Sequence, residues 1–161
     1  KPKQEDMYGV CSCRNVRKII IVRSSFYNNS MDEKSRELIM LLAGGELSEE
    51  KKCYFKSQLN DDLDLCQIFF TAVACRKYEQ AKDIIDIGWN INDINIMSDE
   101  LVICANFESS MEYIDIYISM GLIITEELLN RVIEIAIENR EYFETEKTER
   151  LIEQLKSRIF K

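Results

Sequence analysis

Apolar residues recur at spacings of three and four along most of the chain after residue 30, as in Leu128, Leu129 and Val132. This spacing gathers apolar side chains on one face of a helix, and short polar stretches separate one such segment from the next. The pattern predicts eight helices, at residues 32–43, 48–58, 62–76, 79–87, 98–107, 110–120, 126–140 and 145–159.

Glycines mark several of the expected helix ends. Four of the five glycines, Gly44, Gly45, Gly88 and Gly121, each follow a segment with helical apolar spacing. A helix often ends in a residue with positive φ, a conformation that glycine adopts without steric cost. We therefore expect these glycines to lie at C-terminal caps.

Hydroxyl residues mark the expected helix starts, and they are Ser30, Ser48, Ser98, Ser109 and Thr125. Ser30 and Ser109 have a glutamate three residues later, which is the spacing of a capping box. The other three are followed directly by acidic residues, which are favourable at the positive end of a helix.

Residues 1–30 differ from the rest of the chain. They hold six basic and two acidic residues, a net charge of +4, whereas the whole chain has a net charge of −8, so the other 131 residues carry −12. The β-branched run from Ile19 to Val22 predicts a strand or an extended arm at residues 18–23. We expect this basic N-terminal arm to dock on the acidic body. The alternative is that it contacts a partner protein, nucleic acid or a membrane surface.

Composition limits the chemistry that this chain can perform. It has no histidine, which excludes Ser-His-Asp and Cys-His catalysis and histidine-ligated metals within the chain. An enzyme would have to use a reactive cysteine or a pair of carboxylates, and no glycine-rich phosphate loop indicates a nucleotide cofactor. The net charge makes nucleic acid a poor partner, and no apolar run reaches the roughly 18–20 residues that cross a bilayer.

The cysteines indicate a reducing compartment. Three of the six, Cys66, Cys75 and Cys104, lie in apolar helical stretches, where a free thiol behaves as a small hydrophobic group. We therefore expect reduced thiols and an intracellular, cytoplasmic location. Cys11 and Cys13 form a lone C-x-C with no second ligand pair, and the acidic run 61–64 is better explained by helix capping, so no metal site is expected.

An internal repeat is visible around Gly88 and Gly121, which are 33 residues apart. At the same spacing Ala72 pairs with Ala105 and Ile91 with Ile124, and each block holds two helical segments before its glycine. The segment before Gly45 has the apolar pattern of a second helix, with about ten extra residues before the next unit. The final pair of segments has no closing glycine, as is expected of a terminal cap.

This repeat resembles the ankyrin repeat, in which each unit is a helix pair followed by a glycine turn and a loop. The matching residues are Ala72, Tyr78, Ala81, Ile84, Ile85, Ile87, Gly88, Trp89, Asn90, Ile91 and Asn92, then Ala105, Met111, Ile114, Ile118, Gly121 and Ile124. The Thr-Pro-Leu-His start of the family is missing, so the repeats are degenerate and are similar to those of ankyrin-like proteins of large DNA viruses and intracellular pathogens. The resemblance implies an all-α fold, an α-solenoid of helix-turn-helix repeats over residues 31–161 that follows the extended arm. A plain helical bundle is the alternative.

The resemblance also implies a function. Ankyrin-like proteins are binding modules, so we expect a non-catalytic protein that docks a partner protein on its concave face and repeat loops. The candidate contact residues are Arg76, Lys77, Trp89, Asn90, Asn92, Asp93, Met97, Phe107 and Glu108. Trp89 is the strongest candidate because tryptophan is enriched among binding hot spots, although it could equally pack as core under the next loop.

Overall fold

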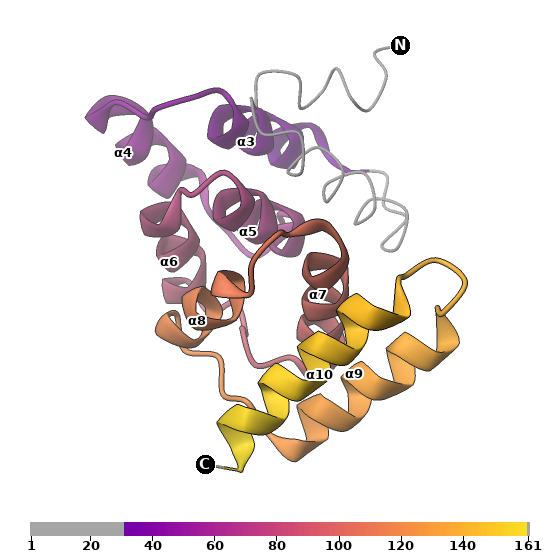
Figure 1. Ribbon diagram of the computed structural model, residues 1–161. Coiled ribbons are helices and arrows are strands. Elements are labelled where there is room, and N and C mark those ends of the chain that lie inside the picture. Colours follow the sequence, from indigo (N-terminus) through magenta and orange to yellow (C-terminus); the bar gives the residue numbers. More distant parts are fainter. Residues whose placement is uncertain (1–30, 161) are drawn as a thin grey trace. The chain divides into compact units, whose positions relative to one another are not determined.

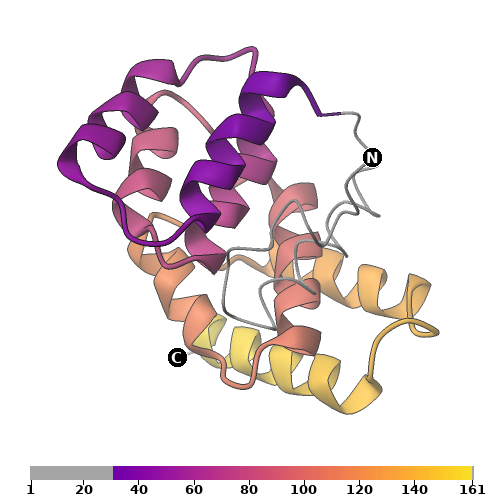
Figure 2. The ribbon, with the colours of Figure 1, turned by 90° about the horizontal axis from the view of Figure 1, so that it is seen from above.

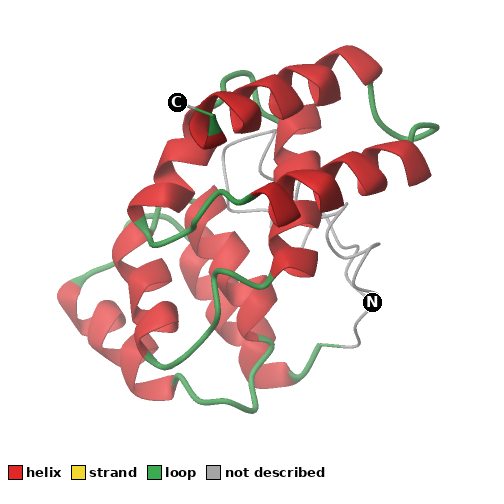
Figure 3. Ribbon diagram, turned by 90° about the horizontal axis from the view of Figure 1, so that it is seen from below, coloured by secondary structure: helices red, strands yellow, loops and turns green. Residues whose placement is uncertain are grey.

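The computed structural model describes residues 31–160, and all of the regular structure in this range is helical (Figures 1 and 3). The helices are α3 (Glu33–Ala43), α4 (Glu49–Gln58), α5 (Leu65–Ala74), α6 (Tyr78–Asp86), α7 (Ile94–Phe107), α8 (Glu112–Ser119), α9 (Glu126–Glu138) and α10 (Thr145–Ile159). The all-α prediction is confirmed for these residues. The basic arm and the strand predicted at 18–23 lie outside the described residues.

Within residues 31–160, no helix combines the length and the apolar character that a bilayer crossing needs. The described helices group into two compact units, with the boundary between Trp89 and Asn90. The first unit contains α3 to α6, and the second contains α7 to α10. Within the described residues, the predicted repeat domain over residues 31–161 is therefore divided into two units.

Acidic and hydroxyl side chains start most of the helices. Ser48 and Thr125 cap α4 and α9 as expected, since their hydroxyl oxygens accept hydrogen bonds from the backbone N–H of Lys51 and Leu128. The acidic run 61–64 also ends in a cap, because the Asp64 carboxylate accepts a hydrogen bond from the backbone N–H at the third residue of α5. The capping prediction for this run is thus confirmed at Asp64.

Three of the expected helix starts are wrong. Helix α3 is capped by Asp32 and not by Ser30, because the Asp32 carboxylate accepts a hydrogen bond from the Ser35 N–H. Helix α7 begins at Ile94, because Asp93 accepts a hydrogen bond from the Ile96 N–H and starts the helix before Ser98. Ser98 lies inside α7, where its hydroxyl donates to the Ile94 carbonyl. Helix α8 begins after Met111 without a side-chain cap, so Ser109 does not start it.

Three helices end in the same hydrogen-bonded turn. After α6, the Gly88 and Trp89 N–H groups donate to the Ile85 and Ile84 carbonyls, which is the Schellman pattern, and Gly88 has φ +114°. The same pattern follows α8, where Gly121 also has φ +114°, and α5, where Arg76 takes the positive φ of +61°. Gly45 has φ +103°, whereas Gly44 has φ −84°. Gly44 is the C-cap residue of α3, so all four glycines lie at helix C-terminal ends as predicted, and three of the four take the positive φ.

Unit 1 is built from two helix pairs. Helix α3 lies beside α5, α5 packs on α6, and α4 contacts α6 (Figures 1 and 2). Leu38 and Leu42 of α3 and Phe69 and Phe70 of α5 are fully buried between them, whereas α4 buries only Phe55. In a stack of helix pairs, a second helix before Gly45 would lie beside α6. The contact of α3 with α5 does not fit that expectation.

Unit 2 has a core of aliphatic side chains contributed by all four of its helices. Helix α7 packs along α9, and α10 contacts both of them. An ion pair of 2.9 Å between Arg158 of α10 and Asp115 of α8 joins α8 to these three helices. The fully buried members include Leu101, Ile114, Val132, Leu151 and Leu155. This packing fixes the loops that lead into α7 and α9.

Candidate interaction surface

The loop before α7 and the loop before α9 are joined by one side chain. The Asn92 amide nitrogen donates to the Gly121 carbonyl at 3.0 Å, and the Asn92 carbonyl oxygen accepts from the Ile123 N–H at 2.9 Å. Both backbone groups belong to the loop after α8. Asn92 therefore uses both ends of its amide to connect two loops of unit 2 that are about 30 residues apart in sequence.

The two residues that flank this connection shape the first loop. The Asn90 side-chain oxygen accepts a hydrogen bond from the Asn92 N–H at 2.9 Å, which closes an Asx turn. Asp93 caps α7 with its carboxylate. Asn90 and Asn92 are exposed and Asp93 is partly buried. Three of the predicted contact residues thus lie together in this loop, and all three make hydrogen bonds that fix it.

The second loop presents an apolar residue that the sequence analysis missed. Ile123 is 65% exposed, although Leu122 beside it is 4% exposed and packs into unit 2. In the 33-residue repeat, Ile123 occupies the position equivalent to Asn90, which was a candidate contact residue. Applying the repeat to the candidate contacts would therefore have found Ile123.

Trp89 lies at the end of unit 1 and stacks on its core. Its ring lies over Phe69, with the ring centroids 4.3 Å apart and the planes at 28°, and it meets Phe70 edge-on at 5.8 Å. The side chain is only partly buried. One face of the indole therefore contributes to packing within the unit, which was the alternative to the hot-spot interpretation.

The other candidate residues fall in different settings. In unit 1, Arg76 is exposed in its positive-φ turn, and Lys77 is partly buried at the start of α6. In unit 2, Met97 is fully buried, so its side chain belongs to the core, not to a surface. Phe107 and Glu108 are partly buried at the end of α7. Of the predicted residues in unit 2, Asn90, Asn92 and Asp93 form the one group of neighbours that includes exposed residues.

A buried carboxylate in unit 2 was not anticipated. Glu100 of α7 is fully buried, and it accepts hydrogen bonds from the Tyr117 hydroxyl of α8 and from the Cys104 thiol, whose sulfur is 3.3 Å away. This cluster connects α8 to α7. Reactive cysteines lie in exposed, electropositive surroundings. A buried thiol beside a carboxylate has neither property, so Cys104 gives no support to the alternative of a cysteine enzyme.

Asp99 next to it in sequence has an unusual environment. Partial burial raises the pKa of its carboxyl to about 6, Arg131 of α9 opposes that rise, and Glu138 and Glu100 add to it. Arg131 itself pairs with Glu134 at 2.9 Å and with Glu138 at 3.7 Å. Asp99 therefore shares its counter-charge with two other carboxylates.

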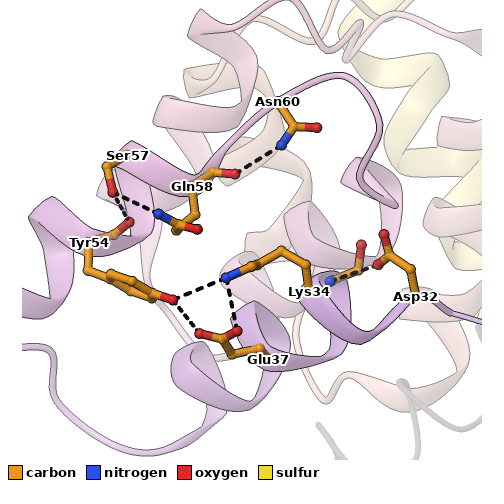
Figure 4. A network of polar contacts seen from close by, with 8 residues as sticks. Asp32, Lys34, Glu37, Tyr54, Ser57, Gln58 and Asn60 are labelled. Atoms are coloured by element: carbon orange, nitrogen blue, oxygen red, sulfur yellow. Dashed lines mark hydrogen bonds and ion pairs between the residues drawn. The ribbon is translucent and has the colours of Figure 1, made fainter.

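A polar network on unit 1 joins α3 to α4 (Figure 4). Lys34 is 3.1 Å from Glu37 and donates to the Tyr54 hydroxyl at 3.2 Å, and that hydroxyl donates to Glu37 at 2.5 Å. The hydrogen bond with Tyr54 is the main cause that raises the pKa of Lys34 and lowers the pKa of Glu37. Glu37 and Tyr54 are exposed and Lys34 is partly buried. Because exposed pairs contribute little to stability, this network connects α3 and α4 without adding much to the free energy of unfolding.

Comparison with known proteins adds no relative, because no family model, no curated protein and no solved structure matches this chain. Two loops held together by Asn92, with exposed polar side chains and one exposed isoleucine, are suited to contact a protein surface.

Proposed function

We propose that this chain is a non-catalytic, ankyrin-like binding module that holds a partner protein with the loops of its helix pairs. The observation that carries the proposal is the Asn92 connection, which makes one continuous edge of the loops before α7 and α9. Loops on a rigid scaffold are where binding residues concentrate. In this proposal the protein acts inside the cell, in keeping with its cysteine content.

The packing of successive helix pairs supports the repeat interpretation. In unit 1 the first helices α3 and α5 lie side by side, and α4 contacts α6; in unit 2 the first helices α7 and α9 lie side by side. Gly88 and Gly121 end their helices with the same φ and the same two hydrogen bonds. Repeats of this kind bury their apolar faces against neighbours and leave their loops available for binding.

The experiment that tests the proposal is the recovery of a specific partner followed by reconstitution. The full chain is immobilised, retained proteins are identified, and each is purified and titrated against the chain by calorimetry. We expect at least one protein to bind saturably with a fixed stoichiometry. A matched control is the same chain with Gly88→Ala and Gly121→Ala, which strains both turns that lead into the loops.

The opposite result would reject the proposal. If no purified protein binds saturably, the chain is not a protein-binding module of this kind. Labelling of the thiols against pH addresses the enzyme alternative in the same preparation. A cysteine that reacts as a thiolate well below its usual pKa of about 8.5 would favour a cysteine enzyme instead.

A further inference from the structure

We propose that Asn92 is a positioning residue, and that the side chain it positions, Ile123, is the contact that enters an apolar pocket on a partner protein rimmed by basic groups. This inference rests on the proposed function and specifies the partner surface. It changes the role predicted for Asn92, whose amide was expected to touch the partner directly.

Hydrogen bonds and buried neighbours hold the backbone of Ile123 in place. Its N–H donates to the Asn92 side chain at 2.9 Å, the carbonyl two residues earlier accepts from the same side chain at 3.0 Å, and Leu122 between them is buried. Ile91 also approaches this loop, since a Cβ on Gly121 would lie 3.8 Å from its Cγ2. The backbone of Ile123 is thus fixed from both sides.

The side chain of Ile123 is exposed. Ile123 is 65% exposed, on a loop whose backbone is held by the two hydrogen bonds of Asn92. A β-branched side chain on a fixed backbone loses little conformational entropy when it is covered. It therefore gains most of the hydrophobic free energy of burial when a partner covers it, which is the property expected of a central contact.

The sequence around Ile123 is acidic. Glu126 and Glu127 follow within one helical turn, both are exposed, and within residues 31–160 neither forms an ion pair. Residues 90–161 hold 15 acidic and 7 basic residues, so this unit carries a net charge of −8, the whole net charge of the chain. A partner that covers Ile123 meets these carboxylates, which favour lysine or arginine around its pocket. A second copy that presented the same loop would bring the same carboxylates and be repelled.

Hydrogen exchange tests the positioning role without a partner. The exchange rate of the Ile123 amide is measured by NMR on the full chain, for the wild type, Asn92→Ala and the control Asn130→Ala, which alters an exposed asparagine of α9. We expect Asn92→Ala to raise the rate by roughly tenfold or more and Asn130→Ala to leave it unchanged, because only Asn92 accepts from this amide. An unchanged rate in Asn92→Ala would overturn the positioning role.

Binding of the purified partner tests the contact role. We expect Ile123→Ser to weaken the affinity by roughly tenfold, the value for losing burial of one aliphatic side chain. Ile137→Ser is the matched control because Ile137 is 61% exposed on α9, outside the connected loops, and it should have no effect. Equal affinity of Ile123→Ser and wild type overturns this inference but leaves the proposed function standing. Absence of any saturable partner removes both.

Two further measurements test the chemistry of the partner. Glu126→Gln with Glu127→Gln should slow association severalfold at low salt, and the difference should vanish at high salt. No effect at either salt concentration would overturn the basic rim. If the wild-type chain dimerises and Ile123→Ser abolishes the dimer, a second copy of the chain covers Ile123. That result would overturn the partner assignment.

Discussion

Trp89→Ala gives the sharpest test of how unit 1 is held together. The indole stacks on Phe69 at 4.3 Å and meets Phe70 edge-on at 5.8 Å, and it is partly buried. Removing about 100 Å² of buried apolar surface costs about 2.5 kcal/mol at ~25 cal/mol per Å². Loss of two aromatic contacts adds about 1 kcal/mol. We therefore expect the free energy of unfolding to fall by about 3.5 kcal/mol.

The assay is urea denaturation of the full chain, followed by far-UV circular dichroism. Trp89→Phe keeps a ring against Phe69, so its loss should be about 1 kcal/mol. Tyr142→Ala is the control, because Tyr142 is 76% exposed and its removal should change the free energy of unfolding by less than about 0.5 kcal/mol. If Trp89→Ala is no more destabilising than Tyr142→Ala, the stacking does not stabilise the unit. That result would favour the interpretation of Trp89 as a binding hot spot.

Three other substitutions probe single features, each by urea denaturation of the full chain. Gly88→Ala should cost about 1–2 kcal/mol, because φ is +114° and no atom lies within 4 Å of the new Cβ, so only backbone strain acts; no loss would mean that the turn relaxes. Arg76→Gly should stabilise by about 0.5 kcal/mol, since it relieves a positive φ of +61° but adds freedom to the unfolded chain, and a destabilised variant would contradict this. Asp99→Asn should stabilise the chain at pH 7.5 and lose that advantage near pH 4. The pKa of Asp99 is about 6 in the folded state, above the usual 3.8, so ionisation of Asp99 costs stability as the pH rises from about 4 to above 6. A gain in stability that does not change with pH would refute this reasoning.

The helices were predictable because local signals agree with one another. Apolar spacing located each helix, Gly88 and Gly121 stopped two of them, and Ser48 and Thr125 started two others. The start of α7 was missed because Asp93 and Ser98 are both good caps, and only the packed structure selects between them. Where caps compete, sequence spacing alone does not decide.

The pairing of helices could not be read from the same signals. Leu38 and its neighbours define an apolar face, but a face does not state which helix covers it. The contact of α3 with α5 depends on the tertiary fold, and it does not fit the expectation that α3 is a second helix. Burial of Glu100 was missed for a related reason, since carboxylates are rarely buried unless a partner such as Tyr117 is present.

The loop residues show a different limit. The repeat placed Asn90 and Asn92 at exposed loop positions, and both are exposed. Position in the repeat did not reveal that the Asn92 amide is engaged with Gly121 and Ile123, because those hydrogen bonds join residues 29 and 31 positions apart. Whether these residues touch a partner stays a prediction.

The double hydrogen bond of Asn92 also limits how this protein can vary. One amide spans two loops, so the number of residues in one loop is matched to the number in the other. An insertion between Gly121 and Ile123 would move the carbonyl acceptor and the N–H donor apart, so that one amide could no longer reach both. Lengthening either loop during evolution or engineering would therefore require a simultaneous replacement of Asn92.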